Sequence, residues 1–145
     1  KNITQYTESS QAQAKNVARG EATIGISFLF GFEEERQAGF KSTKSFAPCE
    51  GTSYEVGGIA LIKGSRNAGQ ARLFYDWLMG PIGQGIGAKA NSLQNPANKS
   101  FKQDPKIPTM DGVKLINYDF KKYGASAERK RILEKWEKEV NSLPR

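Results

Sequence analysis

The fold of this chain is decided by residues 50–84, EGTSYEVGGIALIKGSRNAGQARLFYDWLMGPIGQ. The stretch opens with a polar turn, and the apolar run 56–62 that follows predicts a strand buried on both faces. Residues 64–67, with the sequence GSRN, interrupt this run and include the residue types that cap helices. The pattern therefore predicts a strand followed by a helix that begins near Ala68.

The predicted helix carries apolar side chains on one face. They recur at spacings of three and four residues and are Ala71, Phe74, Tyr75 and Leu78. Gly80 and Pro81 are expected to end the helix, because proline cannot continue a helical hydrogen-bond ladder. Gln84 is expected to lie in a second short helical segment.

Helical and strand-like segments alternate on the N-terminal side of this stretch. Residues 7–19 predict an amphipathic helix ended by Gly20, and the run 23–28 predicts a strand rich in apolar and β-branched residues. Residues 31–39 are polar and indicate a loop or one short helix, and residues 40–47 are compatible with a further strand. Strands alternating with helices favour an α/β fold.

The C-terminal side has three parts. Residues 90–112 are rich in Asn, Pro, Lys and Gly, which predicts an extended connection over the surface, and residues 113–116 indicate a short strand. The clearest helix is 126–140, within a C-terminal helical segment 126–142. Its apolar face is expected to pack on the protein through Ile132, Leu133, Trp136 and Val140.

Composition excludes several classes of function. The chain has 145 residues, enough for one domain with a core, and a net charge of +7 with a pI near 9.5. Its basic residues cluster only modestly, at 129–138, where they alternate with glutamates as on a solvated helix face. No nucleic-acid-binding motif accompanies them, so no nucleic-acid partner is expected.

Catalytic and metal chemistry is also disfavoured by the residue types. The chain contains no histidine, which is the commonest general base and imidazole ligand, and its single cysteine, Cys49, allows no intrachain disulfide. No nucleophile motif or phosphate-binding loop is present. Three consecutive glutamates at 33–35 point in different directions on a helix, which favours a solvated face over a cation site. We therefore expect no enzyme activity, no cofactor and no metal site.

The polar turn at 50–54 is the first candidate binding site. Gly51 allows the backbone to approach a ligand closely, and Thr52 and Ser53 offer hydroxyl and N–H groups. Glu50 can accept hydrogen bonds from ligand hydroxyls, and Tyr54 offers a ring face and a phenol. From these residues alone, an ordinary loop that enters a strand is the favoured interpretation.

Two further places could contact a ligand. Ser27 and Phe28 lie at the end of a predicted strand, where ligands collect in α/β sheets, although core packing is equally compatible with Phe28. Ser9 and Ser10 lie at a predicted helix N-terminus, which suits phosphate or carboxylate groups. Simple N-capping explains these two serines equally well.

The order of motifs resembles the extracellular solute-binding proteins of ABC importers, family 1. The resemblance runs through EGT, Tyr-Glu-Val-Gly-Gly, the apolar run, Lys-Gly-Ser, Ala-x-x-Phe-x-x-Trp-Leu and Pro-x-x-Gln, and includes GEATIGI at 20–26. The most similar branch groups ferric-iron, hexose-phosphate and aminoethylphosphonate binders. The order of these motifs carries the resemblance, which spans about residues 5–136. At 9–13, SSQAQ partly matches a serine-rich turn of this family.

The resemblance implies a fold and a set of partners. Family members are much longer than this chain, so it implies the C-terminal half of a two-lobed periplasmic-binding-protein (type II) fold, with the N-terminal half as a partner. It also implies capture of a small-molecule or ion ligand outside the cytoplasmic membrane, and delivery to an ABC permease. Periplasmic or extracellular location, with or without a lipid anchor, follows from the same resemblance.

The resemblance also bears on the ligand. It implies that Glu50 and Thr52 lie at the cleft between lobes. Ferric binders of this branch use two adjacent tyrosines near the position of Phe28 and Phe30, and this chain has no adjacent tyrosines. A small anion such as a sugar phosphate or phosphonate is therefore the expected ligand. Ferric iron and a ligand-sensing module of the same fold are the alternatives.

Overall fold

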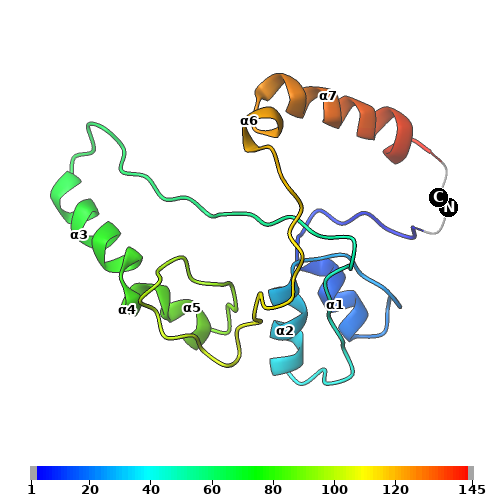
Figure 1. The fold of residues 1–145 in the computed structure, drawn as a ribbon, viewed down its shortest axis with the longest axis horizontal. Helices are drawn as coiled ribbons and strands as arrows, with labels where there is room; N and C mark the ends of the chain where they lie inside the picture. The colour runs from blue at the N-terminus through cyan, green and yellow to red at the C-terminus, as the bar shows by residue number, and fades with distance from the viewer. Residues whose placement is uncertain (1–2, 144–145) are drawn as a thin grey trace.

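A computed structural model describes residues 3–143, and in them the regular structure is helical. Figure 1 shows the helices and the long connections between them. The elements are α1 (Ala12–Ala18), α2 (Leu29–Gln37), α3 (Ala68–Met79), α4 (Pro81–Gln84), α5 (Ile86–Lys89), α6 (Phe120–Tyr123), α7 (Ser126–Trp136) and the π-helical turn η1 (Glu137–Asn141).

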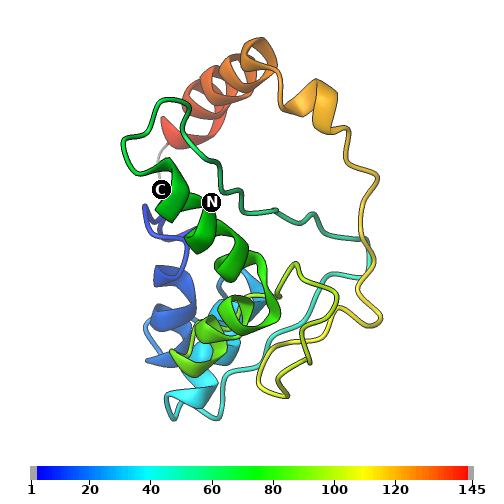
Figure 2. The same cartoon turned by 90° about the vertical axis from the view of Figure 1, so that its left-hand side faces the viewer.

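The helices form three groups. α1 packs on α2, α3 is followed by α4 and α5, and α6 leads into α7 and η1. Figure 2 shows α7 at one end of the molecule and long tubes of chain leading from it to the other helices, with the α3–α5 group overlapping α1 and α2 in this view. Within residues 3–143, no helix of one group packs on a helix of another. The connecting segments therefore carry the contacts that join the groups.

α1 is shorter than its sequence pattern predicts, because local hydrogen bonds occupy the chain before it. The Thr7 hydroxyl donates to the Ser9 carbonyl at 3.0 Å, and the Gln11 N–H is 3.3 Å from the Ser9 hydroxyl. Such bonds stabilise a turn in competition with the helix. Gly20, at φ +76°, follows α1 in the left-handed region that favours glycine, as expected for a residue that ends a helix.

The predicted strands are not formed within residues 3–143. Residues 23–28, 40–47 and 56–62 run without β-ladders, and the single β-type pairing in the described part of the chain is a parallel bridge between Thr52 and Leu115. A strand is stabilised by hydrogen bonds to a neighbouring strand, and these segments have none. The α/β prediction is therefore unconfirmed, and the strand assignments are wrong for the chain by itself.

The helix that follows residues 56–62 was predicted correctly. α3 begins at Ala68 after Asn67, although no side chain caps it, and Gly80 ends it. Pro81 is the first residue of α4, where its missing N–H costs nothing, and Gln84 lies in that helix as predicted. The Gln84 side-chain amide donates to the carbonyl of Leu78 at 3.1 Å, which fixes the corner between α3 and α4.

A small apolar core lies where the sequence predicts a surface connection. Leu93 and Ile107 are almost fully buried and cluster with Ala88 of α5, and Phe30 of α2 and Phe101 pack against them. The segment 90–112 is irregular, as predicted, but it is not purely superficial. Two apolar side chains in a polar stretch were too weak a signal to reveal this core.

The C-terminal helix is confirmed, but its packing is looser than predicted. α7 and η1 together cover 126–141 of the predicted segment. The Trp136 ring meets that of Tyr6 edge-on at 4.8 Å, and Trp136 remains partly exposed together with Ile132 and Leu133. Most of this apolar face is therefore uncovered. None of the helices in residues 3–143 has both the length and the apolar character needed to cross a bilayer.

Candidate functional site

The turn at 50–54 is held against a second segment of the chain. The Thr52 N–H donates to the Lys114 carbonyl at 2.9 Å, and the Ile116 N–H donates to the Thr52 carbonyl at 3.0 Å. Gly51 has φ +123°, and a Cβ there would lie 3.0 Å from the Ile116 side chain. Glycine is therefore needed both for the turn and for the close approach.

The Thr52 pairing changes which groups of the turn can contact a ligand. Its main-chain N–H and carbonyl are both used by the neighbouring segment. Its hydroxyl is only 3.5 Å from the Ser53 carbonyl, a weak interaction that a ligand oxygen can replace. Glu50, Ser53 and Tyr54 are exposed. The side chains, more than the backbone of Thr52, are thus the available binding groups.

Glu50 is a ready acceptor of hydrogen bonds. A hydrogen bond from backbone at Glu50 lowers the pKa of its carboxyl, and the adjacent Cys49 thiol, 3.4 Å away, acts in the same direction. Burial opposes the shift, but less strongly. A carboxylate that stays ionised suits the recognition of ligand hydroxyls.

Tyr54 belongs to a chain of aromatic contacts. Its ring meets that of Phe120 edge-on at 5.7 Å, and Phe120 meets Tyr118 at 4.9 Å. Tyr118 lies 5.2 Å from Tyr123, above which the Lys122 ammonium is found at 5.1 Å. Residues 54 and 118–123 therefore form one aromatic surface beside the turn, which the sequence pattern did not reveal because Tyr54 is distant along the chain from the other members.

The second set of predicted site residues is brought together between α1 and α2. The Ser27 hydroxyl donates to the Ser10 carbonyl at 2.6 Å, and Ser9 occupies the turn before α1. Phe28 stacks on Phe30 at 5.3 Å, with Phe30 facing the core cluster and Phe28 partly exposed. Phe30 is thus a packing residue, and the Ser27 oxygen keeps lone pairs to accept bonds from a ligand.

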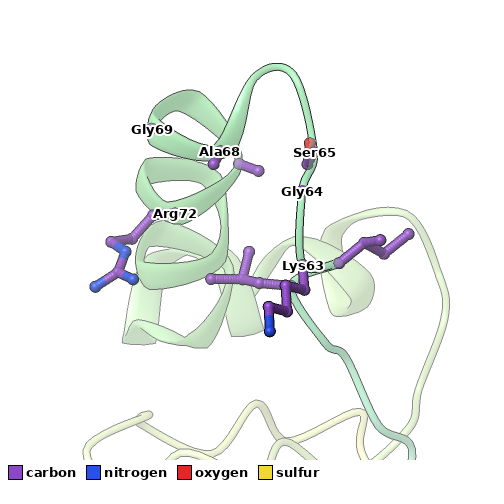
Figure 3. A pocket seen from close by; sticks show the side chains of 9 residues that line it. Lys63, Gly64, Ser65, Ala68, Gly69 and Arg72 are labelled. Carbon is purple, nitrogen blue, oxygen red and sulfur yellow. The ribbon is translucent and has the colours of Figure 1, made fainter.

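The structure does not join the two sets of candidate residues into one pocket. Within residues 3–143, no hydrogen bond or ring contact connects the turn at 50–54 with Ser9, Ser10, Ser27 or Phe28. A hollow of about 340 Å³ lies elsewhere, between residues 61–65 and α3 (Figure 3). Lys63 and Ser65 line it from the connecting segment, and Arg72 lines it from the helix.

This hollow was missed by the site prediction. Its walls include Leu61, Ile62, Ala68 and Ala71, so it is largely apolar with two cations at its margin. The Lys-Gly-Ser sequence was noted as a family motif but was not assigned a binding role. Gly64, at φ +80°, makes the bend that folds the segment over the helix.

Comparison with known proteins identifies the larger fold of which these features form a part. The search against family models finds no match for the chain. A protein from Haemophilus influenzae is 45% identical over 140 residues, which is 96% of this chain and 40% of the relative. The solved structure of the periplasmic binding protein AfuA from Actinobacillus pleuropneumoniae, with exogenous fructose-6-phosphate bound, matches 98% of this chain with a TM-score of 0.86 and 43% identity.

A second solved structure agrees with the first. The periplasmic binding protein P5PA matches 96% of the chain with a TM-score of 0.79 and 30% identity. The chain spans about 44% of each of these two structures and 40% of the relative from Haemophilus. Residues 3–143 therefore have the fold of one portion of a periplasmic binding protein.

Proposed function

We propose that the protein containing this chain binds a small solute outside the cytoplasmic membrane and delivers it to an ABC transporter permease. The observation that carries this proposal is the match of nearly the whole chain to AfuA, at a TM-score of 0.86 and 43% identity. At this identity, more than the bare fold is shared. In this proposal the protein is periplasmic, has no enzymatic activity and closes a cleft around its ligand.

The proposed ligand is a small anion that also bears hydroxyl groups, such as a sugar phosphate or a phosphonate. AfuA was solved with fructose-6-phosphate bound, which supports this class for a chain 43% identical to it. The net charge of +7 favours an anionic ligand over a cationic one. The carbonyl and Cγ of Lys114 lie against Gly51, so in this proposal its flexible side chain brings a cation to the turn.

In this proposal the candidate residues have different roles. The ionised Glu50 carboxylate accepts hydrogen bonds from ligand hydroxyls, and the Thr52 hydroxyl donates one or accepts one. Tyr54 offers its ring edge and phenol from the aromatic surface. Glu50 repels phosphate, so in this proposal the anionic end of the ligand points away from it and toward cations or free N–H groups.

The portion of the protein outside this chain would supply the rest of the cleft. Ligand pockets in such folds are concave and bury most of the ligand surface, and the turn at 50–54 is exposed on its present side. The candidate residues between α1 and α2 belong to the same site only if the complete protein brings them close. Ser9, Ser10, Ser27 and Phe28 remain proposed contacts on this condition.

Calorimetry on the full-length protein tests the proposal. The protein is titrated with fructose-6-phosphate, fructose, inorganic phosphate, an aminoalkylphosphonate and ferric citrate. We expect binding of a phosphate ester or phosphonate, with fructose bound far more weakly. Tight binding of ferric citrate without a response to phosphate esters would contradict the anionic ligand and favour ferric iron. Native mass spectrometry of the purified protein would then identify any bound ligand.

A further inference from the structure

The aromatic surface beside the turn at 50–54 presents ring area to solvent. Phe120, Tyr54 and Tyr123 are 53%, 43% and 38% exposed, and Tyr118 is partly buried. The contacts that Tyr54 and Tyr118 make with Phe120 are edge-on, with interplanar angles of 62° and 72°. In an edge-on pair one ring uses its rim, so both of its faces stay free of that neighbour. The surface can therefore receive an apolar partner.

The main chain holds these rings beside the candidate turn. The parallel bridge between Thr52 and Leu115 places the turn next to the segment that leads into α6. Asp119 caps α6, because its carboxylate accepts a hydrogen bond of 2.9 Å from the Lys122 N–H, and Phe120 is the first residue of this helix. Rings that are held in place before binding lose little conformational entropy when a ligand arrives.

The turn and the rings together match the two kinds of surface on a sugar. Glu50 and the Thr52 hydroxyl can bond to the hydroxyl groups around the rim of the sugar. The C–H groups on its faces carry a small positive partial charge and pack on the negative face of an aromatic ring. A phosphonate without a sugar has no such C–H face, so most of the ring area would stay uncovered in its complex.

An aminoalkylphosphonate is a poorer fit for the same rings. Its ammonium group could lie over an aromatic face, but the Lys122 ammonium already lies 5.1 Å from the centre of the Tyr123 ring. A second cation there meets like-charge repulsion, to which the net charge of +7 adds. A sugar carries no charge on its carbon skeleton and avoids this repulsion.

We propose that the aromatic surface of residues 54 and 118–123 packs against the C–H face of the ligand and selects a sugar phosphate over a phosphonate without a sugar. This inference rests on the proposed function and deepens it, because it assigns the sugar part of the ligand to a second set of residues. Glu50 and Thr52 bind hydroxyls at the rim of the sugar, and Tyr54 and Phe120 contact its face. The rings therefore determine specificity, and the affinity for smaller anions does not depend on them.

Calorimetry on the full-length protein and on matched variants tests this selection. Phe120→Leu and Tyr118→Leu keep an apolar side chain but remove the ring, and Phe120→Tyr keeps a ring. Each protein is titrated with fructose-6-phosphate and with an aminoalkylphosphonate. Phe74→Leu is the control, because Phe74 is a comparably exposed ring, at 57%, that contacts Trp77 on α3 instead.

The parent protein is expected to bind fructose-6-phosphate more tightly than the phosphonate. Phe120→Leu and Tyr118→Leu should each weaken fructose-6-phosphate binding by roughly tenfold and leave phosphonate binding unchanged, whereas Phe120→Tyr should recover most of the affinity. Phe74→Leu should match the parent. Nuclear Overhauser contacts should join ring protons of residues 54, 118 and 120 to carbon-bound protons of the sugar, and amide exchange at Lys122 reports whether α6 stays folded in each variant.

Two affinity results would overturn this inference and leave the proposed function standing. One is a parent protein that binds the phosphonate as tightly as fructose-6-phosphate. The other is unchanged fructose-6-phosphate affinity in both leucine variants while Glu50→Ala weakens it. If a leucine variant loses protection at Lys122, the parent complex decides, because a lack of ring-to-sugar contacts there also overturns the inference. A parent protein that binds neither phosphate esters nor phosphonates overturns this inference and the proposed ligand class together.

Discussion

The side-chain carboxylate of Glu34 accepts a hydrogen bond of 2.9 Å from the main-chain N–H of Leu93. Its other oxygen accepts one of 3.1 Å from the Gln11 side chain, so Glu34 joins α2 to α1 and to the core segment. Glu34 was expected on a solvated face with its two neighbours. It instead links α1 and α2 to the segment that follows α5.

Replacing Glu34 should weaken this link. Glu34→Ala leaves the Leu93 N–H without its acceptor, and the loss of a hydrogen bond to a charged group typically costs about 1.5 to 3 kcal/mol. We expect faster amide exchange at Leu93 and a lower free energy of unfolding of the full-length protein, measured by urea denaturation. Glu35→Ala is the matched control, because within residues 3–143 the Glu35 side chain accepts no hydrogen bond, and an equal effect there would contradict the assignment.

The corner between α3 and α4 should tolerate no side chain at Gly83. A Cβ there would lie 2.5 Å from the Leu78 main chain, which cannot move without disturbing α3. Overpacking of this kind costs roughly 1 to 3 kcal/mol, so Gly83→Ala should lower the melting temperature. Gly69→Ala has open space around the new Cβ and lies in the first turn of α3, so it should be neutral or stabilising.

The ligand proposal makes Glu50 and Thr52 sensitive positions. Glu50→Ala and Thr52→Val should each weaken binding by roughly ten- to a hundredfold, since a hydrogen bond involving a charged group typically contributes about 1.5 to 3 kcal/mol. The circular-dichroism spectrum and melting curve should remain close to those of the parent protein, because neither side chain packs in the core. Calorimetry measures the affinity.

Glu55→Ala serves as the control for that pair. Glu55 is an exposed carboxylate just outside the turn, so it tests whether the loss of one negative charge alone changes the affinity. We expect little change or a slight gain for an anionic ligand. Unchanged affinity in both turn variants would leave the turn with a structural role only.

The start of α7 contains a titratable pair. The hydrogen bond from Arg131 lowers the pKa of Glu128, with distances of 2.7 and 2.8 Å from the guanidinium to the two carboxylate oxygens. The pKa of Glu128 is lower in the folded protein than in the unfolded chain. This pair therefore stabilises the folded state at pH values above the ordinary carboxyl range. Its contribution disappears as the pH falls through the folded-state value.

Arg131→Gln should therefore raise the pKa of Glu128, as followed by nuclear magnetic resonance titration of its side-chain carboxyl. Both side chains are on the protein surface, so the change in melting temperature at neutral pH should be small. Arg129→Gln removes a cation of the same helix that, among residues 3–143, makes no bond to Glu128, and should shift the pKa of Glu128 much less. A pKa of Glu128 that stays low in Arg131→Gln would assign the shift to another cause.

The longer helices α3 and α7 were predictable from the sequence because their determinants are local, whereas the short helices α5 and α6 were not predicted. The stops at Gly20 and Gly80 and the start at Ala68 depend on neighbours a few residues away, and all three agree with the structure. The C-terminal helix follows from spacing alone. The prediction that the first helix begins at residue 7 was wrong for an equally local reason. Hydrogen bonds at Ser9 stabilise a turn before Ala12, where α1 begins.

Strands and the site were less predictable because they depend on distant partners. The run at 56–62 has the composition of a buried strand, but pairing needs a neighbour that residues 3–143 do not supply. The contact of Gly51 with Ile116 and the ring contact of Tyr54 with Phe120 join residues more than sixty positions apart. No pattern within a single segment reveals such contacts.

The bridge between Thr52 and Leu115 has a consequence for the order of folding events. It closes a loop of about 60 residues, for which the entropic cost is on the order of 4 kcal/mol. Two main-chain hydrogen bonds contribute only about 1 to 3 kcal/mol in total, so the bridge cannot form early by itself. The turn at 50–54 should therefore take its final shape late in folding, after the helix groups are in place.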